Sequence, residues 1–314
     1  MDPIRYRFFR HSPARRELMP QPYEVFSYPM GDRTVRRSPD SPDPGPAPQV
    51  LWVTDAAVDW TVVTAWAQLA SHDHPGRPRI LVMPYLPSAR GDKDTPGPAQ
   101  INGAMAGRSG ITDLVTIDPH SAVWLEAMNR AAGEIGAVVQ THLLPLGPVV
   151  GDALARRDDF AGVIAPDRGA RNRAAAVAEA FGVALFTATK HRDPATGKLS
   201  GYALTELADP AGRYLVVDDI CDGGGTFGLL AAAAPAAATL QLWVTHGGFT
   251  GGQRTRDALS RYAAVDTTDS LPGAERFAAS EPTATVHPLW HRVNAVITDL
   301  TGTADHIDTR SDLS

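Results

Sequence analysis

The chain has 314 residues, of which 43% are hydrophobic and 20% charged, and its formal net charge is −6. These values are typical of a globular protein with about two domains, and the negative charge excludes nucleic-acid binding through bulk electrostatics. A single cysteine, Cys221, excludes an internal disulfide framework and favours a reducing compartment. The sequence shows no long apolar run and no signal-peptide pattern, so we expect a cytoplasmic protein without a membrane partner.

The first fifty residues give weak structural patterns. Residues 1–23 are rich in arginine and proline without a clear period, which predicts an irregular lead-in, and a strand is expected at 23–28. Residues 38–48 are rich in proline, which excludes a helix or a central strand. This stretch is therefore predicted to be an exposed loop.

From residue 50 onward, apolar runs alternate with helical patterns. Strands are predicted at 50–54, 79–84, 114–117, 162–165, 183–187, 214–217 and 240–245, and helices at 60–70, 122–132 and 171–181. Strands separated by helices predict an α/β fold with mainly parallel sheets flanked by helices, in which ligands bind at the carboxyl ends of the strands. The pattern is interrupted near residues 146–153, which predicts two domains, 1–148 and 149–314, and would suit an internal duplication.

The segment from Tyr214 to Thr226 carries the strongest functional signal. An apolar run ends in Asp218 and Asp219, and a third acid, Asp222, precedes three glycines. Carboxylates at a strand end can accept hydrogen bonds from ribose hydroxyls or bind a divalent cation, and a glycine turn can direct N–H groups at a phosphate. Thr226 is predicted to cap the helix that follows. The predicted ribose-phosphate residues are Asp218, Asp219, Asp222, Gly223, Gly224, Gly225 and Thr226.

The stretch Val217–Thr226 resembles the phosphoribosyl diphosphate loop of type I phosphoribosyltransferases and of ribose-phosphate diphosphokinases. The two families share a fold. The resemblance therefore implies two type I phosphoribosyltransferase-like halves, of which the first binds ATP and the second the ribose phosphate. Because the two families differ in their reactions, the remaining motifs must distinguish between them.

A second motif follows the strand at 79–84, where a proline-stiffened turn carries Arg90 and Asp92. Such a turn suits a nucleotide or a polyphosphate, although a charged surface loop is the alternative. The segment resembles an ATP-binding segment of the diphosphokinases, in which Arg90 matches and Gly91 stands where the family has glutamine. A looser match runs from Phe26 to Asp32. The resemblance implies that Arg90, Asp92 and Asp32 bind ATP.

Two further residues lie just beyond strand ends. His120 alone is more often a structural hydrogen-bonding group than a ligand. In the diphosphokinases, however, the histidine of an aspartate-x-histidine pattern helps to bind the catalytic metal, and His120 fits that pattern. Asp167 matches the family's proline-aspartate-x-glycine signature, with Arg173 beyond it as a phosphate-binding or structural partner. The resemblance implies Mg²⁺ bound by His120 and Asp167, with ATP as the co-substrate.

The segment 189–198 is charged and hairpin-like, and it contains Lys190 and Arg192. In the diphosphokinases, a lysine and an arginine with this spacing lie on a mobile flap and stabilise the transferring phosphoryl group, whereas phosphoribosyltransferases have no counterpart in this order. The resemblance therefore implies Mg²⁺-dependent transfer of the pyrophosphoryl group of ATP to the anomeric hydroxyl of ribose 5-phosphate, or of a 5′-substituted ribose, with release of AMP. Lys190 and Arg192 would be the catalytic residues.

Alternatives remain open at the acceptor. Gly223 takes the place of a threonine whose hydroxyl helps to bind a phosphate monoester in the family, so the acceptor could carry a larger substituent. ADP-ribose is one such acceptor, used by phage-type relatives in NAD salvage. A phosphoribosyltransferase and a non-catalytic regulatory homologue are further alternatives. The resemblance also implies a homo-oligomer, either a dimer or a hexamer.

Overall fold

The computed structural model describes residues 6–12, 14–38, 47–154, 160–192, 199–204 and 207–304. Contacts divide the chain into two compact units, one formed by residues 1–144 together with 290–314 and the other by 145–289. This division differs from the predicted one because helix α9 (Trp290–Ala304) belongs to the first unit and not to the second. Its first residue stacks on Trp52 of the first unit, with ring centroids 5.5 Å apart.

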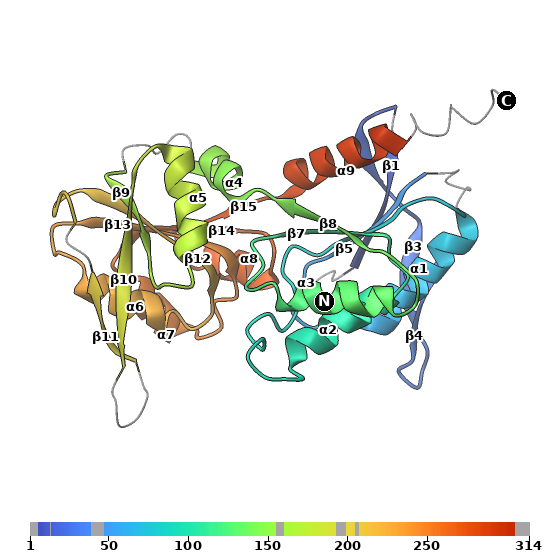
Figure 1. Ribbon diagram of the computed structural model, residues 1–314, viewed down its shortest axis with the longest axis horizontal. Coiled ribbons are helices and arrows are strands. Elements are labelled where there is room, and N and C mark those ends of the chain that lie inside the picture. Colours follow the sequence, from blue (N-terminus) through green and yellow to red (C-terminus); the bar gives the residue numbers. More distant parts are fainter. Residues whose placement is uncertain are drawn as a thin grey trace. The chain divides into compact units, whose positions relative to one another are not determined.

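The first unit contains a six-stranded sheet in the order β2-β1-β5-β6-β7-β8. The strands are β1 (Tyr6–Ser12), β2 (Glu17–Pro20), β5 (Gln49–Val53), β6 (Arg79–Val82), β7 (Asp113–Ile117) and β8 (Gln140–Leu144). Strands β5 to β8 are parallel, and the helices α1 (Trp60–Asp73), α2 (Pro98–Arg108) and α3 (Val123–Gly133) connect them. Because successive crossovers step in one direction, right-handed connections place these three helices on one face, and α9 covers the other (Figure 1).

Alternation along β5 assigns its side chains to the two faces. Leu51 and Val53 pack with Val62 and Trp66 of α1 in one apolar core. Trp52 points to the opposite face, where it stacks on Trp290 of α9. All five residues of β5 are buried, as expected for a strand that is covered on both sides.

Residues 1–23 were predicted to be irregular, and this prediction was wrong. Strand β1 pairs antiparallel with β5 and with β2. Its partner β5 lies about forty residues further along the chain, so the pairing has no local sequence signal. The strand predicted at 23–28 is β3 (Tyr23–Ser27), which forms a separate hairpin with β4 (Arg33–Arg37) against α1.

The second unit contains a seven-stranded sheet in the order β11-β10-β9-β12-β13-β14-β15, parallel except for β11. The strands are β9 (Gly162–Ala165), β10 (Ala184–Arg192), β11 (Leu199–Leu204), β12 (Arg213–Cys221), β13 (Thr239–Gly247), β14 (Tyr262–Thr268) and β15 (Ala284–His287). Helices α4 (Leu146–Leu154) and α5 (Arg171–Phe181) lie on one face. The other face carries α6 (Gly225–Ala233), α7 (Gln253–Leu259) and α8 (Pro272–Ala278) (Figure 1).

The stretch near 146–153 was expected to interrupt the pattern, but it forms α4. Pro148 falls in the first turn of this helix, where backbone N–H groups have no partner within the helix and proline is tolerated. The proline-rich stretch 38–48 lies largely outside the described residues.

The order of the strands creates a switch point in the second unit. From β9 the chain crosses through α5 to β10 on one side, and from β12 it crosses through α6 to β13 on the other. Strands β9 and β12 are adjacent and parallel, with Ile164 opposite Val216. In parallel α/β sheets, ligands bind in the crevice at the carboxyl ends of two such strands. We therefore expect a ligand to bind at the segments that follow β9 and β12.

Candidate functional site

A pair of acids and one arginine occupy the carboxyl end of β12. Asp218 and Asp219 lie within the strand, which continues to Cys221. Arg173, from the first turn of α5, places its Nη1 3.1 Å from Asp218 Oδ1 and 3.1 Å from Asp219 Oδ1. The exposed fractions of the three side chains are 14%, 5% and 11% for Asp218, Asp219 and Arg173. One guanidinium therefore serves two nearly buried carboxylates.

The electrostatics of this pair are unusual for aspartates. Burial, together with the neighbouring carboxylate of Asp219, raises the pKa of Asp218 to about 8, and the charge of Arg173 opposes this shift. Such a carboxyl group is costly to ionise in the free protein. Hydrogen-bond donors of a ligand, such as two vicinal hydroxyl groups, would stabilise the ionised form.

The glycine turn leads directly into α6. Gly224 has a left-handed backbone (φ 75°) and is the N-cap residue, so Thr226 lies within the first turn of the helix and not at the predicted cap position. The reason is that Gly224 adopts the left-handed conformation more readily than other residues, which lets the helix begin two residues earlier, at Gly225. The N–H groups of a first helical turn have no partner inside the helix. This turn is therefore suited to binding a phosphate.

The three glycines have different surroundings. A Cβ atom at Gly223 or Gly225 would meet no atom within 4 Å. A Cβ atom at Gly224 would lie 3.1 Å from the Cβ of Ala258. Gly224 is therefore required by the backbone and by packing, whereas Gly223 faces open space.

A second glycine-rich loop, Gly247–Gly252, supports the first. The N–H groups of Gly248 and Phe249 donate to the carbonyl of Cys221, and the N–H of Thr250 donates to that of Asp222. The hydroxyl of Thr250 also donates to Asp222 Oδ1 at 2.5 Å. Asp222, predicted to bind ribose phosphate, thus also ties the two loops together. Sequence reasoning missed Thr250, although its position among glycines after a strand was a usable signal.

Asp167 follows β9, the strand next to β12. Its Oδ1 accepts a hydrogen bond from the N–H of Ala170 at 3.0 Å, just before α5 begins, and its side chain is half-buried. The same helix carries Arg173. The structure therefore brings Asp167, Arg173, Asp218 and Asp219 to the switch point of the second unit.

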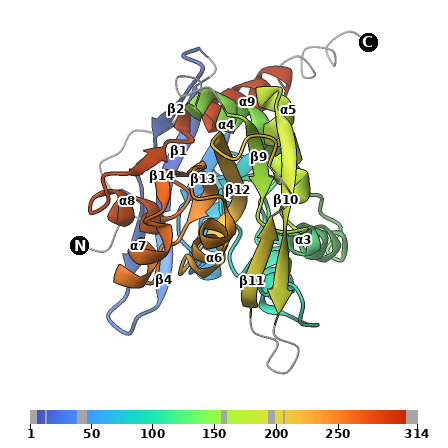
Figure 2. The same cartoon turned by 90° about the vertical axis from the view of Figure 1, so that its left-hand side faces the viewer.

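The predicted catalytic pair lies on a two-stranded arm at the edge of the same sheet (Figure 2). Lys190 and Arg192 belong to β10, which pairs antiparallel with β11, and the register shifts between His191 and Arg192. The side chains of Lys190 and Arg192 and the turn 193–198 lie outside the described part of the chain.

In the first unit, two of the predicted ATP residues, Arg90 and Asp92, follow β6, and the predicted metal ligand follows β7. The hydroxyl of Thr116 donates to the carbonyl of Pro84 at 3.0 Å, which ties the start of the loop at 84–97 to the end of β7. Within this loop, Arg90 is exposed, and Asp92 buries its Oδ1 without a hydrogen-bond partner among the described residues. His120 is half-buried beyond the end of β7. Adjacent parallel strands thus present both segments at one edge of the sheet.

Asp32 lies on a different element, the turn of the β3–β4 hairpin. Its carbonyl accepts a hydrogen bond from the N–H of Tyr28 at 2.7 Å. The next residue, Arg33, forms an ion pair of 3.3 Å with Asp59, which caps the start of α1. This contact places the turn near the carboxyl end of β5.

A metal would have to be held by few protein ligands. Among the described residues, no group of three or more His, Cys, Asp or Glu side chains is arranged to hold a metal ion. Mg²⁺ commonly binds through one or two carboxylates together with substrate phosphates and water. Asp167, which follows the strand next to β12, fits this mode.

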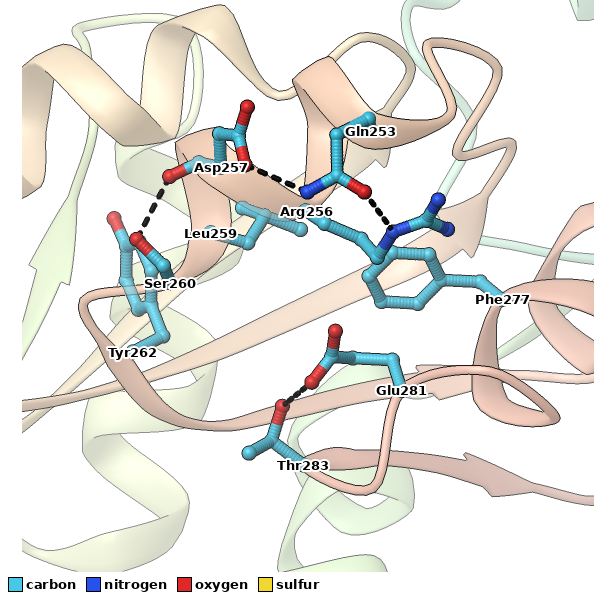
Figure 3. A pocket seen from close by; sticks show the side chains of 9 residues that line it. All are labelled: Gln253, Arg256, Asp257, Leu259, Ser260, Tyr262, Phe277, Glu281 and Thr283. Carbon is cyan, nitrogen blue, oxygen red and sulfur yellow. Dashed lines mark hydrogen bonds between the residues drawn. The ribbon is translucent and has the colours of Figure 1, made fainter.

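A pocket of about 320 Å³ lies between α7 and α8 (Figure 3). It contains none of the predicted residues. Phe277 lines it and stacks on Phe249, with ring centroids 4.2 Å apart. The pocket therefore borders the loop Gly247–Gly252 without being part of the site.

No helix in the described ranges combines the length and the apolar character that crossing a membrane needs.

No protein-family model matches the chain. It is 30% identical over 223 residues to a ribose-phosphate pyrophosphokinase of Granulibacter bethesdensis, a match that covers 66% of this chain and 67% of that protein. A protein of the same name from Hyphomonas neptunium is 29% identical over 62% of each chain. Another, from Methanopyrus kandleri, is 29% identical over 84% of this chain and 89% of its own.

One solved structure shares the fold over most of the chain. The phosphoribosylpyrophosphate synthetase from Mycobacterium smegmatis superposes with a TM-score of 0.69 and 18% sequence identity, covering 91% of this chain and 92% of its own. At this identity the likeness establishes the α/β fold with type I phosphoribosyltransferase-like sheets.

Proposed function

This chain belongs to the ribose-phosphate pyrophosphokinase family, and from that membership we propose that it transfers the pyrophosphoryl group of ATP to the anomeric hydroxyl of ribose 5-phosphate. The observation that supports this most is the arrangement of Asp218 and Asp219 ahead of the glycine turn at the switch point of the second unit. The two carboxylates accept hydrogen bonds from vicinal ribose hydroxyls. The N–H groups from Gly223 to Thr226 bind the 5-phosphate.

The reaction needs positive charge more than it needs covalent chemistry. The anomeric oxygen attacks the β-phosphorus of ATP in line, and its hydroxyl proton passes to solvent. The bond from that phosphorus to the α,β-bridging oxygen breaks, and AMP leaves with that oxygen. Negative charge spreads over the oxygens of the transferring group, and cations that are already in place stabilise it. We assign this role to Lys190 and Arg192. Arg90, Asp92 and Asp32 bind ATP.

Mg²⁺ belongs to this proposal, with His120 of the first unit and Asp167 of the second as the residues that would each hold an ion within their own unit. The ion, when bound, supplies positive charge to the polyphosphate. Asp167 already holds its carboxylate at the start of α5 through the N–H of Ala170, so little reorganisation would be needed. A homo-oligomer, dimer or hexamer, and a cytoplasmic location complete the proposal.

The experiment that tests this function mixes the purified protein with ATP, Mg²⁺ and ribose 5-phosphate and measures the release of AMP. We expect one AMP for each molecule of phosphoribosyl diphosphate formed, and no reaction with a chelator present. A folded protein that releases no AMP with any ribose acceptor would contradict the proposal. Such a result would favour the regulatory homologue, whereas base-dependent release of pyrophosphate would favour a phosphoribosyltransferase.

A second acceptor has specific support. Because a Cβ atom at Gly223 would meet no atom within 4 Å, the turn has room for a substituent larger than a phosphate monoester. ADP-ribose is the alternative acceptor, with the same attack on the β-phosphorus and the same leaving group. The AMP assay with both acceptors decides between them, and a strong preference for ribose 5-phosphate would contradict the larger acceptor.

A further inference from the structure

The loop at 84–97, which carries Arg90 and Asp92, contains a residue in an unfavourable conformation. Ser88 has a φ of 58°, in the left-handed region that residues with a side chain rarely adopt. Such a residue persists where surrounding contacts determine its position. The contacts of Ser88 therefore show what holds this loop in place.

One side chain on α2 supplies those contacts. Asn102 Nδ2 donates to Ser88 Oγ at 3.3 Å and to the carbonyl of Pro98 at 2.9 Å. Its Oδ1 accepts a hydrogen bond from the indole Nε1 of Trp60 at 2.9 Å. An indole can only donate and a carbonyl can only accept, so the orientation of the Asn102 amide is fixed by its partners. A rotation of the amide by 180° would break these bonds.

The loop at 84–97 also packs against the start of α2. The N–H of Gly91 donates to the carbonyl of Ser88 at 2.8 Å, and the carbonyl of Gly91 accepts from the N–H of Ala99 at 3.3 Å. A Cβ atom at Gly91 would lie 2.3 Å from Pro98 Cγ, so the two segments are as close as glycine allows. Arg90 lies between Ser88 and Gly91. Its backbone position is therefore set by residues that contact α2.

We propose that Asn102 is a positioning residue for the nucleotide, which acts through Ser88 and Pro98 to hold Arg90 and Asp92 in the arrangement that binds ATP. Trp60 fixes the orientation of Asn102 and thereby connects α1 to the loop. The proposal rests on the proposed function, because it assumes that the loop binds ATP. Asn102 itself need not touch the nucleotide.

The test compares three substitutions by calorimetric binding of α,β-methylene-ATP, which cannot be cleaved at the reacting bond. Asn102→Ala removes all three hydrogen bonds and should raise the Kd about tenfold, the effect expected for losing one or two net hydrogen bonds. Asn102→Asp keeps the shape and the acceptor for Trp60 but loses the donors, and we expect it to resemble Asn102→Ala. Trp60→Phe removes only the indole N–H and should have a smaller effect.

The matched control is Ile101→Ala, at the neighbouring position on α2, where the side chain is 50% exposed. It should leave the Kd of the nucleotide within about twofold of wild type. Binding of ribose 5-phosphate should not change in any of these variants. A general loss of stability would instead weaken the binding of both substrates and lower the melting temperature, which would contradict the proposal. Nucleotide binding by Asn102→Asp with the wild-type Kd would also overturn it.

Hydrogen exchange separates this inference from the proposed function. In Asn102→Ala, the amides of Gly91 and Ala99 should exchange about tenfold faster, while those of β6 and α1 keep the wild-type rate. Unchanged exchange in the loop would overturn the positioning role, whether or not the protein binds ATP. If exchange is faster in Asn102→Ala but the wild-type protein binds no nucleotide, the positioning role stands and only the proposed function is contradicted.

Discussion

Arg173 Nη1 lies 3.1 Å from Asp218 Oδ1, and the same nitrogen lies 3.1 Å from Asp219 Oδ1. The contact crosses from the first turn of α5 to the end of β12. It explains how two neighbouring acids can be buried at a strand end, since one delocalised cation lowers the cost of both. The acceptor site is thus set by a helix and a strand that start 42 residues apart in the chain, at Arg171 and Arg213.

Removing this cation should destabilise the protein in a pH-dependent way. Arg173→Gln leaves the two carboxylates without this guanidinium, which should cost about 2 to 4 kcal/mol of unfolding free energy near pH 8. The loss should be smaller near pH 5, where the raised pKa of Asp218 keeps that residue protonated. Thermal denaturation at both pH values measures this difference.

The control for this prediction is Arg171→Gln, two residues away on the same helix. Arg171 is exposed and its Nη1 contacts Thr187 Oγ1 at 3.1 Å, so the change should stay within about 0.5 kcal/mol. A loss for Arg173→Gln that is no larger than for Arg171→Gln would show that the pair does not need the cation. A larger loss that is independent of pH would contradict the link to the ionisation of Asp218.

Asp218→Asn should stabilise the substrate-free protein at alkaline pH and abolish its activity. The pKa of Asp218 is raised from an ordinary value of 3.8 to about 8 in the folded protein, so between these values the folded state holds a proton that the unfolded state has lost. Protonated Asp218 contributes fully to the free energy of unfolding below pH 4, and this contribution is lost as the pH rises through 8. Asparagine has no charge to form. Its advantage over wild type should therefore appear in the melting temperature at pH 8 to 9 and disappear at pH 4 to 5.

The acceptor turn could be predicted from sequence because its signals are local. A β-branched run, adjacent acids and three glycines define the end of β12 and the start of α6 within thirteen residues. The partners of these acids could not be predicted in the same way. That Arg173 faces Asp218 depends on β9 and β12 being neighbours in the sheet, which no local pattern shows.

Among the elements that were not predicted, α2 and α9 were missed for different physical reasons. Helix α2 was not predicted because it contains Gly103 and Gly107, which lower helix propensity. In the structure these glycines allow α3 to approach, since Cβ atoms there would lie 2.3 Å and 2.2 Å from the carbonyl oxygens of Trp124 and Met128. Helix α9 has an apolar face, but its packing against Trp52 in the first unit is a long-range contact.

The arm formed by β10 and β11 gives the prediction that best separates the two families. Replacing Lys190 and Arg192 by alanine should lower kcat about 10²- to 10³-fold or more, because charge stabilisation at the transferring group is lost. The melting temperature should stay unchanged. His191→Ala, between the two in the same strand, is the control and should keep most of the activity. Full activity in the double variant would point to a phosphoribosyltransferase.

Thr250 should act on the acceptor through Asp222. Thr250→Val keeps the shape but removes the hydroxyl that donates to Asp222 Oδ1, a hydrogen bond to a charged group. The KM for ribose 5-phosphate should rise about tenfold, with the KM for ATP unchanged. Thr250→Ser restores the donor and should return the KM to near the wild-type value. Steady-state kinetics with each substrate varied in turn would distinguish this role from a general loss of activity, which would change both KM values.

Neighbouring glycines of the turn should respond in opposite ways to substitution. Gly223→Thr places its side chain in open space, so the protein should fold with an unchanged melting temperature. The added hydroxyl and the reduced room should shift the ratio of kcat/KM toward ribose 5-phosphate and away from ADP-ribose. Gly224→Ala instead forces a Cβ atom into a left-handed backbone, 3.1 Å from the Cβ of Ala258, which should cost about 1 to 2 kcal/mol and most of the activity with either acceptor. If Gly223→Thr left the ratio of the two acceptors unchanged, Gly223 would not determine the choice of acceptor, and the space beside it would have no bearing on the substrate.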